Sequence, residues 1–167
     1  MRRHGPHYRV PLRRRREGRT DYRRRLRLLR ADVPRAVVRK TNAGVIVQVT
    51  QFTERGDTIL ASAVARDLLK LGWTGPTGNV PAAYLTGFLA GRRAVGKGIT
   101  SAVLDIGRQT PTKGGRLFAV LKGLVDAGLE IPHDAEVLPG DDRVRGAHLP
   151  PEIGKAFEAA KAKVEAG

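Results

Sequence analysis

Two glycine-containing segments are the first candidates for chemistry in this sequence. The first, Gly91 to Gly98, matches all but the last position of a P-loop, where Gly98 replaces the Ser or Thr that would bind magnesium. It also closes a predicted helix, whereas a P-loop follows a strand and opens a helix so that backbone amides can cradle phosphate. We therefore expect no nucleotide site, no cofactor and no small-molecule substrate.

The second segment, Leu104 to Gly107, places Asp105 at the end of a predicted strand. An acid there could hold a metal ion in an RNA-processing nuclease of the ribonuclease H type, but a two-metal nuclease needs several convergent carboxylates. Asp57, Asp67 and Asp126 are the candidate companions, and their spacing does not predict convergence. The nuclease is the alternative function, and we favour an Asp105 that caps a turn or pairs with an arginine.

Metal binding and covalent catalysis have little support in the remaining residues. The chain lacks cysteine, which removes disulfides, thiolate nucleophiles and Cys-based zinc sites and suits a reducing compartment. The four histidines, of which His4 and His7 are expected to join phosphate contacts, show no i, i+4 pairing and no acidic partner at metal spacing. We predict no catalytic residue and no metal site.

Positive charge is concentrated at the N-terminus. Residues 1–40 contain 15 Arg and one Lys against three acidic residues, which is a net charge of +13 out of +15 for the whole chain. Lys and Arg neutralise phosphates and release counterions, and the planar arginine fork also binds phosphate bidentately and stacks on bases. The sequence therefore predicts a polyanionic partner that is bound through an N-terminal arm.

The arm covers residues 1–19 and is predicted to be extended, because Pro6 and Pro11 oppose a helix and the four arginines from Arg13 repel one another. Thr20 can cap a helix over residues 21–31, which would dock by an apolar stripe and turn its arginines outward. That stripe consists of Tyr22, Leu26, Leu29 and Val33. The RNA-binding candidates here are Tyr8, Arg9, Arg13, Arg14, Arg15, Arg16, Arg19, Tyr22, Arg23, Arg24 and Arg27.

Two further clusters combine cations with short polar side chains. One is a predicted hairpin turn, and the other is a loop that leads into a helix N-terminus, whose free amides favour phosphate. The candidates are Arg39, Lys40, Thr41 and Asn42 in the turn, and Arg108, Thr112, Lys113 and Arg116 in the loop.

The rest of the chain predicts one globular α/β domain over residues 20–131, with a mixed sheet covered on both faces. The predicted strands are 36–41, 45–50, 58–63 and 101–106, with turns at Asn42–Gly44 and Gly56-Asp57. The predicted helices are 64–71, 80–94 after an Asn79 cap, and 115–127. Residues 132–167 are expected to form an irregular segment and a C-terminal helix over 151–165. Ala83, Gly87 and Gly91 form a small-residue stripe that we expect to pack against another element.

Several motifs closely resemble the archaeal and eukaryotic branch of the universal L-eighteen family of large-subunit ribosomal proteins. The resemblance spans residues 5–148 and keeps the family's order and spacing. The motifs are Tyr8-Arg-Val-Pro11, Arg13-Arg-Arg-Arg-Glu-Gly18, Asp21-Tyr22, Val38-Arg-Lys-Thr-Asn42, Gly72-Trp73, Gly78-Asn-Val-Pro-Ala-Ala-Tyr-Leu-Thr-Gly87, Leu104-Asp-Ile-Gly107, Pro111-Thr-Lys-Gly114 and Asp126-Ala-Gly-Leu-Glu-Ile-Pro-His133.

This resemblance implies a non-catalytic protein of the central protuberance that binds 5S rRNA, bridges it to large-subunit rRNA and neighbours other ribosomal proteins. It implies a three-layer α/β/α fold of ribonuclease H-like topology, and RNA contacts in Arg9 to Arg27 and in Arg39 to Asn42. The archaeal form is expected, because eukaryotic relatives carry a longer C-terminal extension. No stretch reaches the roughly 20 apolar residues of a membrane span. With the absence of cysteine, this leads us to expect a cytoplasmic protein, and the resemblance implies that it is ribosome-bound. A general DNA-compacting protein is a further alternative.

Overall fold

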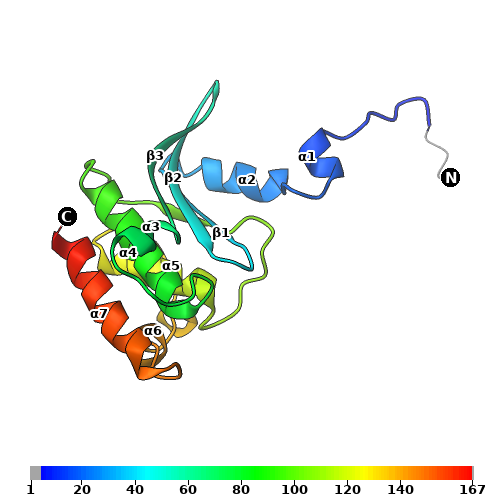
Figure 1. The fold of residues 1–167 in the computed structure, drawn as a ribbon. Helices are drawn as coiled ribbons and strands as arrows, with labels where there is room; N and C mark the ends of the chain where they lie inside the picture. The colour runs from blue at the N-terminus through cyan, green and yellow to red at the C-terminus, as the bar shows by residue number, and fades with distance from the viewer. Residues whose placement is uncertain (1–4, 167) are drawn as a thin grey trace.

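Four strands form one mixed sheet in the computed structural model, which describes residues 5–166 (Figure 1). The spatial order is β3-β2-β1-β4. β1 (Arg35–Lys40), β2 (Val45–Thr53) and β3 (Gly56–Val64) form an antiparallel meander, and β4 (Val103–Asp105) pairs parallel to β1. The predicted meander, the turn before β2 and the α/β class are therefore confirmed. The likeness to ribonuclease H stays a prediction.

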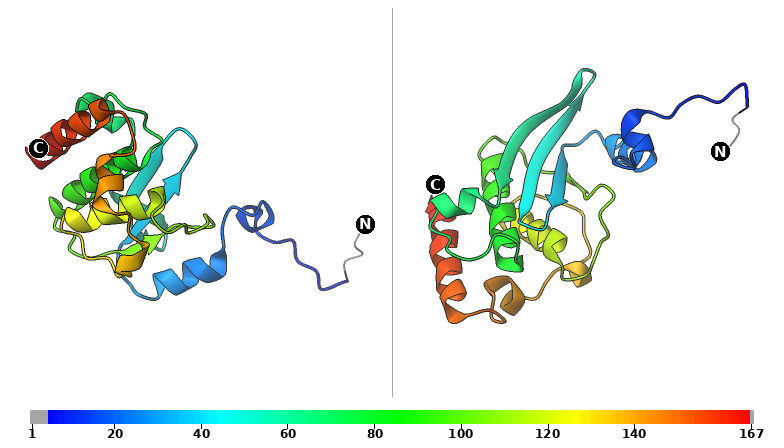
Figure 2. Two further views of the ribbon diagram at one scale, coloured as in Figure 1. Left: turned by 90° about the horizontal axis from the view of Figure 1, so that it is seen from below. Right: turned by 45° about the vertical axis from the view of Figure 1, so that its right-hand side comes forward.

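The helices cover the sheet unequally. They are α1 (Arg13–Arg16), α2 (Tyr22–Leu29), α3 (Asp67–Lys70), α4 (Val80–Val95), α5 (Arg116–Asp126), α6 (Asp141–Arg145) and α7 (Pro151–Ala166), with one 3₁₀ turn at Ala135–Val137. α4 and α5 cover one face of the sheet, and α7 packs on the side of α4 that points away from the strands (Figure 2). α2 lies on the opposite face, which we call the outer face.

The two sheet faces differ in burial. Val45, Val47 and Val49 of β2 point towards α4 and α5 and are buried, as strand alternation requires. On the outer face, Ile46 is 39% and Ile59 is 53% exposed. α2 therefore covers only part of this face, and the apolar core lies between the sheet and the α4–α5 layer.

The small-residue stripe of α4 packs against α5, as expected. A β-carbon built on Gly87 would lie 2.3 Å from the carbonyl oxygen of Val120, and one on Gly123 would lie 2.3 Å from that of Tyr84. A β-carbon cannot lie that close to a carbonyl oxygen, so both helices need glycine at these positions. These glycines bring the two backbones together in the centre of the core.

Several local predictions differ from the structure. The second strand turn lies at Glu54 and Arg55 instead of Gly56 and Asp57, because β2 and β3 continue beyond the predicted strands. The helix predicted over residues 64–71 is reduced to the four residues of α3, and the strand predicted over 101–106 to the three of β4. Antiparallel pairing with β2 holds residues 64 and below in strand geometry, so tertiary pairing overrides the local helical pattern.

The arm is not extended throughout. Arg13–Arg16 form one helical turn, in which the amides of Arg15 and Arg16 donate to the carbonyl of Leu12. Glu17 at the end of this turn accepts from Arg19 at 3.0 Å, so a carboxylate offsets part of the repulsion among the arginines. His4, which we expect to contact phosphate, lies outside the described residues.

The C-terminal helix is confirmed by its anchors. Phe157 and Val164 of α7 are each 3% exposed, and the Phe157 ring lies 5.6 Å from that of Tyr84.

Among residues 5–166, none of the helices combines the length and the apolar character that crossing a membrane would need.

Candidate nucleic-acid interface

Arg35 at the start of β1 organises the charges of the outer face. Its side chain is 2% exposed, and its guanidinium donates to two carboxylates. Nη1 lies 2.8 Å from Oδ2 of Asp105 on β4, and Nη2 lies 2.7 Å from Oδ2 of Asp57 on β3. A guanidinium buried this deeply needs such compensation, so the two acids are required by Arg35.

Asp105 has three partners among residues 5–166. Besides Arg35, it accepts from Nη2 of Arg39 at 3.3 Å and from the amide of Gly107 at 2.8 Å. Arg39 also donates to the backbone carbonyl of Asp105. The expectation that Asp105 caps a turn and pairs with an arginine is confirmed. Its carboxylate is occupied by two arginines of the protein itself.

α2 begins at an Asx cap. Asp21 accepts hydrogen bonds from the amides of Arg23 and Arg24, at 3.0 and 3.1 Å. The prediction that Thr20 is the cap is therefore wrong. Thr20 instead accepts from Nε of Arg14 at 2.9 Å, which fastens the α1 turn to the start of α2.

α2 is held to the outer face by hydrogen bonds and an ion pair of its arginines. Arg24 donates to the carbonyl of Gly107 at 2.7 Å, and Arg25 donates to Oδ1 of Asp57 at 2.8 Å. No α2 residue is buried, and Leu26 is 55% exposed. The predicted docking by an apolar stripe is thus only partly right, because Leu26 is exposed while Tyr22, Leu29 and Val33 are half-buried. Carboxylates and carbonyls of the outer face supply the directed contacts.

The pKa values of two carboxyls reflect these contacts. Partial burial would by itself raise the pKa of Asp57, but the hydrogen bonds and charges of Arg25 and Arg35 outweigh it and lower the pKa. The amide of Arg24, and after it that of Arg23, lowers the pKa of Asp21 against the opposing effect of desolvation. Both carboxylates are therefore ionised at neutral pH, and Asp57 can hold α2 to the sheet.

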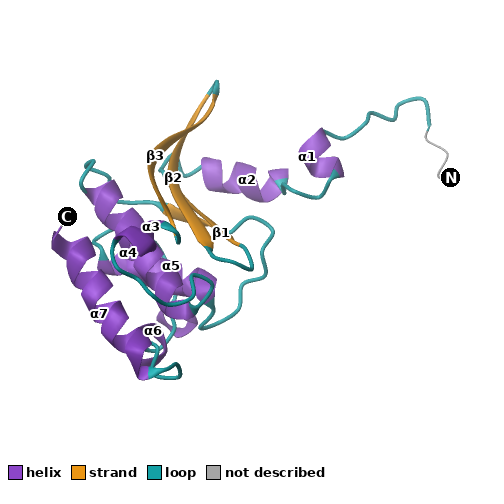
Figure 3. Cartoon of the chain, in the orientation of Figure 1, coloured by secondary structure: helices purple, strands orange, loops and turns teal. Residues whose placement is uncertain are grey.

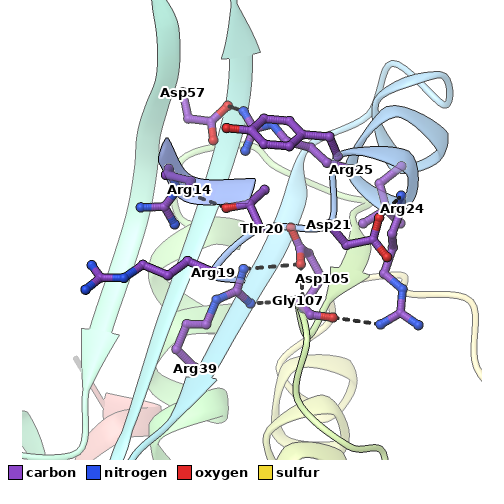
Figure 4. Close-up of a pocket in the computed structure, with 12 residues that line it drawn as sticks. Arg14, Arg19, Thr20, Asp21, Arg24, Arg25, Arg39, Asp57, Asp105 and Gly107 are labelled. Carbon is purple, nitrogen blue, oxygen red and sulfur yellow. Dashed lines mark hydrogen bonds and ion pairs between the residues drawn. The ribbon is translucent and has the colours of Figure 1, made fainter. Parts of the chain in front are cut away.

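A pocket of about 440 Å³ lies between α2, the α1 turn and the outer face (Figure 4). Figure 4 shows arginines from separate segments arranged around it: Arg14 and Arg19 from the arm, Arg25 from α2 and Arg39 from β1. Its lining includes five arginines against three aspartates, so the pocket retains excess positive charge. Such a site attracts phosphate groups.

Another set of arginines is exposed to solvent. Within residues 5–166, these side chains are exposed and make no hydrogen bond or ion pair. They are Arg9, Arg15, Arg16, Arg23 and Arg27. Arg13 shares Glu17 with Arg19 but remains largely exposed. Tyr8 is 48% exposed, and Tyr22 is half-buried at the pocket.

The predicted hairpin turn is partly occupied by contacts inside the protein. Nη1 of Arg116 donates to the carbonyls of Thr41 and Gly78, at 2.9 and 3.1 Å. Thr41 closes the turn through hydrogen bonds with Gly44. Arg116 therefore braces the turn, while the exposed side chain of Asn42 lies at its tip.

The loop before α5 contributes separate cations. Arg108 is exposed and lies beside the arm, since its Nη1 is 3.0 Å from the point where a β-carbon on Gly18 would be. Thr112 and Lys113 are also exposed, and Lys113 pairs with Glu136 at 3.1 Å. The structure therefore brings Arg108 to the arm, whereas Lys113 contacts the irregular C-terminal segment.

Sequence reasoning missed Arg25 and Arg35 as site residues. Arg25 lies one turn after Asp21 and next to Arg24, on the face of α2 that meets the sheet. Arg35 shares its strand face with Arg39, because residues at i and i+4 of a strand point the same way. That alternation, together with Asp105 on a predicted strand, is the signal that could have indicated an ion-pair network.

Comparison with known proteins shows which family this chain resembles. A family model described as ribosomal large subunit proteins 60S L5 and 50S L18 matches residues 6–101 and 96–134. The large ribosomal subunit protein uL18 of Haloarcula marismortui is 54% identical over 145 residues, which cover 87% of this chain and 78% of the relative. The uL18 protein of Aeropyrum pernix is 55% identical over 146 residues, covering 87% and 68%. That of Korarchaeum cryptofilum is 54% identical over 142 residues, covering 85% and 73%.

The chain belongs to the uL18 family of large-subunit ribosomal proteins. The resemblance inferred from its motifs is thus confirmed. Membership of the uL18 family gives the chain a structural role in the ribosome and removes the nuclease alternative. The outer face agrees, because Arg35 occupies the space between the two acids that converge there. No group of three or more His, Asp or Glu residues that could hold a metal ion occurs in the part of the chain that the structure describes.

Proposed function

We propose that this uL18-family protein binds 5S rRNA and helps to attach it to large-subunit rRNA in the central protuberance of a cytoplasmic ribosome. The observation that carries the proposal is the array of outward arginines on α1 and α2, which the Arg24 and Arg25 contacts hold against the body. An arginine array of this kind suits two RNA surfaces, because guanidinium groups can face phosphates on either side of a thin arm.

The arm projects from the body and is only one part of the proposed interface (Figure 3). The pocket between α2 and the outer face would receive phosphate groups close to the body. Arg108 extends the positive surface from the loop beside the arm. RNA bound along this line would bury guanidinium groups that residues 5–166 leave without a partner, and it would release the counterions that accompany both charges.

The role of the arm is tested by removing residues 1–19 and measuring 5S rRNA affinity between 50 and 300 mM salt. The logarithm of affinity should fall less steeply with the logarithm of salt, by roughly 0.7–0.9 for each phosphate that the arm no longer neutralises. Lys155→Ala is the control, because Lys155 is exposed on α7 at a distance from the arm and should leave the slope unchanged. An unchanged slope after the deletion would contradict the proposed role of the arm.

The choice of RNA is tested by competition. Random-sequence duplex DNA at physiological salt should displace 5S rRNA poorly if shape and single-stranded regions contribute to recognition. Equal competition by DNA would favour the DNA-compacting alternative. Cross-linking of assembled large subunits should then join residues of α1 and α2 to 5S rRNA and to large-subunit rRNA.

A further inference from the structure

A second pocket, of about 770 Å³, lies between β3, α4 and α7. The end of α7 and the N-terminal arm lie on opposite sides of the body in Figures 1 and 2. We propose that this pocket, termed the α4–α7 pocket, binds an acidic segment of another protein, which inserts an aliphatic side chain between flanking carboxylates. This site lies outside the proposed RNA-binding residues and does not depend on them.

The interior of the α4–α7 pocket is aliphatic. Leu71, Leu89 and Val164 contribute to its lining from three different segments. Val95 is 37% exposed at the same pocket, so apolar surface remains open to a partner. Burying an aliphatic side chain there would remove apolar area from water on both molecules.

The pocket also carries four cations: Arg92 and Arg93 near the end of α4, Lys97 just beyond it, and Lys163 on α7. No carboxylate is among the described residues that line the pocket. Arg93 is paired with Asp67 at 3.0 Å, which lies next to the pocket. Lys163 has no hydrogen bond or ion pair within residues 5–166. Charge complementarity therefore calls for an acidic ligand, with Lys163 as the cation that is free to bind it.

Two of these cations also determine how a partner can bind. Arg93 donates to the carbonyl of Ser62 at 2.7 Å, and Lys97 donates to the carbonyl of Leu60. Both carbonyls belong to β3, which is an edge strand of the sheet. Because these acceptors are already occupied, a partner strand cannot extend the sheet at this point. Recognition must use side chains in the pocket.

The lining favours protein over RNA. Proteins that read single-stranded RNA stack bases on aromatic or arginine planes. The described lining of this pocket contains no aromatic residue, whereas Tyr22 lines the pocket beside α2. Its two arginines are already engaged, since Arg92 donates to the carbonyl of Glu165 and Arg93 to Ser62 and Asp67. An aliphatic cavity with a cationic rim is better filled by Leu or Ile between Glu or Asp than by a nucleotide. The chain would then hold RNA at its arm and a protein at the end of α7.

The test uses the full chain with its arm saturated by 5S rRNA, so that the arm cannot bind an acidic probe. The probe is a fluorescein-labelled peptide in which single leucines alternate with pairs of glutamates. Lys163→Glu should weaken peptide binding about fivefold, because a favourable charge contact becomes repulsive. Lys155→Glu makes the same charge change on the same helix, away from the pocket, and should leave peptide affinity within about twofold.

The apolar contribution is tested on the peptide, which leaves the protein fold intact. Replacing each leucine of the probe by glycine keeps its charge and should reduce affinity more than tenfold. A photo-reactive leucine in the probe should cross-link to residues 59–62, 89–97 or 163–164. Cross-links confined to residues 5–30, equal effects of the two lysine variants, or displacement by polyuridylate that cross-links to the same pocket would each overturn the proposal.

Discussion

Asp57 and Asp105 are bridged by the single guanidinium of Arg35, at 2.7 and 2.8 Å. Through this bridge β3, β1 and β4 share one charge network on the outer face, and Arg25 connects α2 to it through Asp57. The network adds to the limited apolar contact that α2 makes with the sheet. The position of the exposed arginines on α2 therefore depends on charges of the sheet.

The first prediction concerns Asp105→Asn. The substitution keeps an oxygen that can accept from the Gly107 amide but removes the charge that compensates Arg35 and Arg39. The free energy of unfolding should fall by about 3 kcal/mol in urea titrations at pH 7, because Arg35 stays buried. Glu136→Gln removes an exposed carboxylate from its pair with Lys113 and should cost about 0.5 kcal/mol or less. Similar small decreases in both variants would show that the bridge contributes little.

The second prediction is a pH dependence that comes from Asp57. Its pKa is lower in the folded chain than its ordinary value of 3.8, so the folded state favours the ionised form. This contribution is complete well above pH 3.8 and is lost as pH falls through the lower, folded-state pKa. Asp57→Asn should therefore reduce the free energy of unfolding by about 1–2 kcal/mol at pH 7. The difference from wild type should shrink below pH 3.8.

Urea titrations at pH 7, 5, 4 and 3 measure this difference. The lowered pKa of Asp21 is present in both proteins and cancels from the comparison. A difference that stays constant down to pH 3 would mean that the charge of Asp57 is not what stabilises the contact.

The third prediction separates two helical glycines. Gly87→Ala would place a β-carbon 2.3 Å from the Val120 carbonyl oxygen, so α4 and α5 must move apart at a cost of about 2–3 kcal/mol. Gly154→Ala lies in α7, where the nearest atom is 3.9 Å away, and should raise stability by about 0.5–1 kcal/mol through helix propensity. Thermal unfolding should thus shift in opposite directions. A matching shift in the two variants would contradict close packing at Gly87.

The parts of the fold that sequence predicted well have strong local signals. Asn79 accepts from the amide of Ala82 and begins α4 as predicted. The small residues of α4 correctly indicated a close contact with another element, which is α5. The docking of α2 had no such signal. Its apolar residues suggested one face, but the partner surface was decided by Asp57 and Arg35, which are brought together only by strand pairing. The periodicity of residues within one segment cannot predict an ion-pair network between segments that are distant in the sequence.

The candidate site shows the same division. The charge count identified the arm, but it could not separate arginines that hold the protein together from those left for a partner. Arg24 and Arg116 donate to backbone carbonyls, whereas Arg23 and Arg27 extend from α2 without a partner among residues 5–166. Whether an arginine holds the protein together or stays available depends on its position on the helix and on which hydrogen-bond acceptors neighbouring segments bring close. Both are set by tertiary structure.

The last prediction uses this division on α2. Replacing Arg23 and Arg27 by alanine should weaken 5S rRNA binding and lower the salt slope by roughly 1.4–1.8, if each contacts one phosphate. Amide hydrogen exchange of α2 in the free protein should stay unchanged, because neither side chain contacts the body.

Replacing Arg24 and Arg25 by alanine removes the same charge but also the contacts to Gly107 and Asp57. In the free protein, α2 amides should then exchange faster, because local opening of α2 no longer has to break these contacts and so costs less free energy. Equal exchange in the two double variants would mean that α2 is held by other means, and an undiminished salt slope in the first would mean that its outward arginines do not meet phosphate.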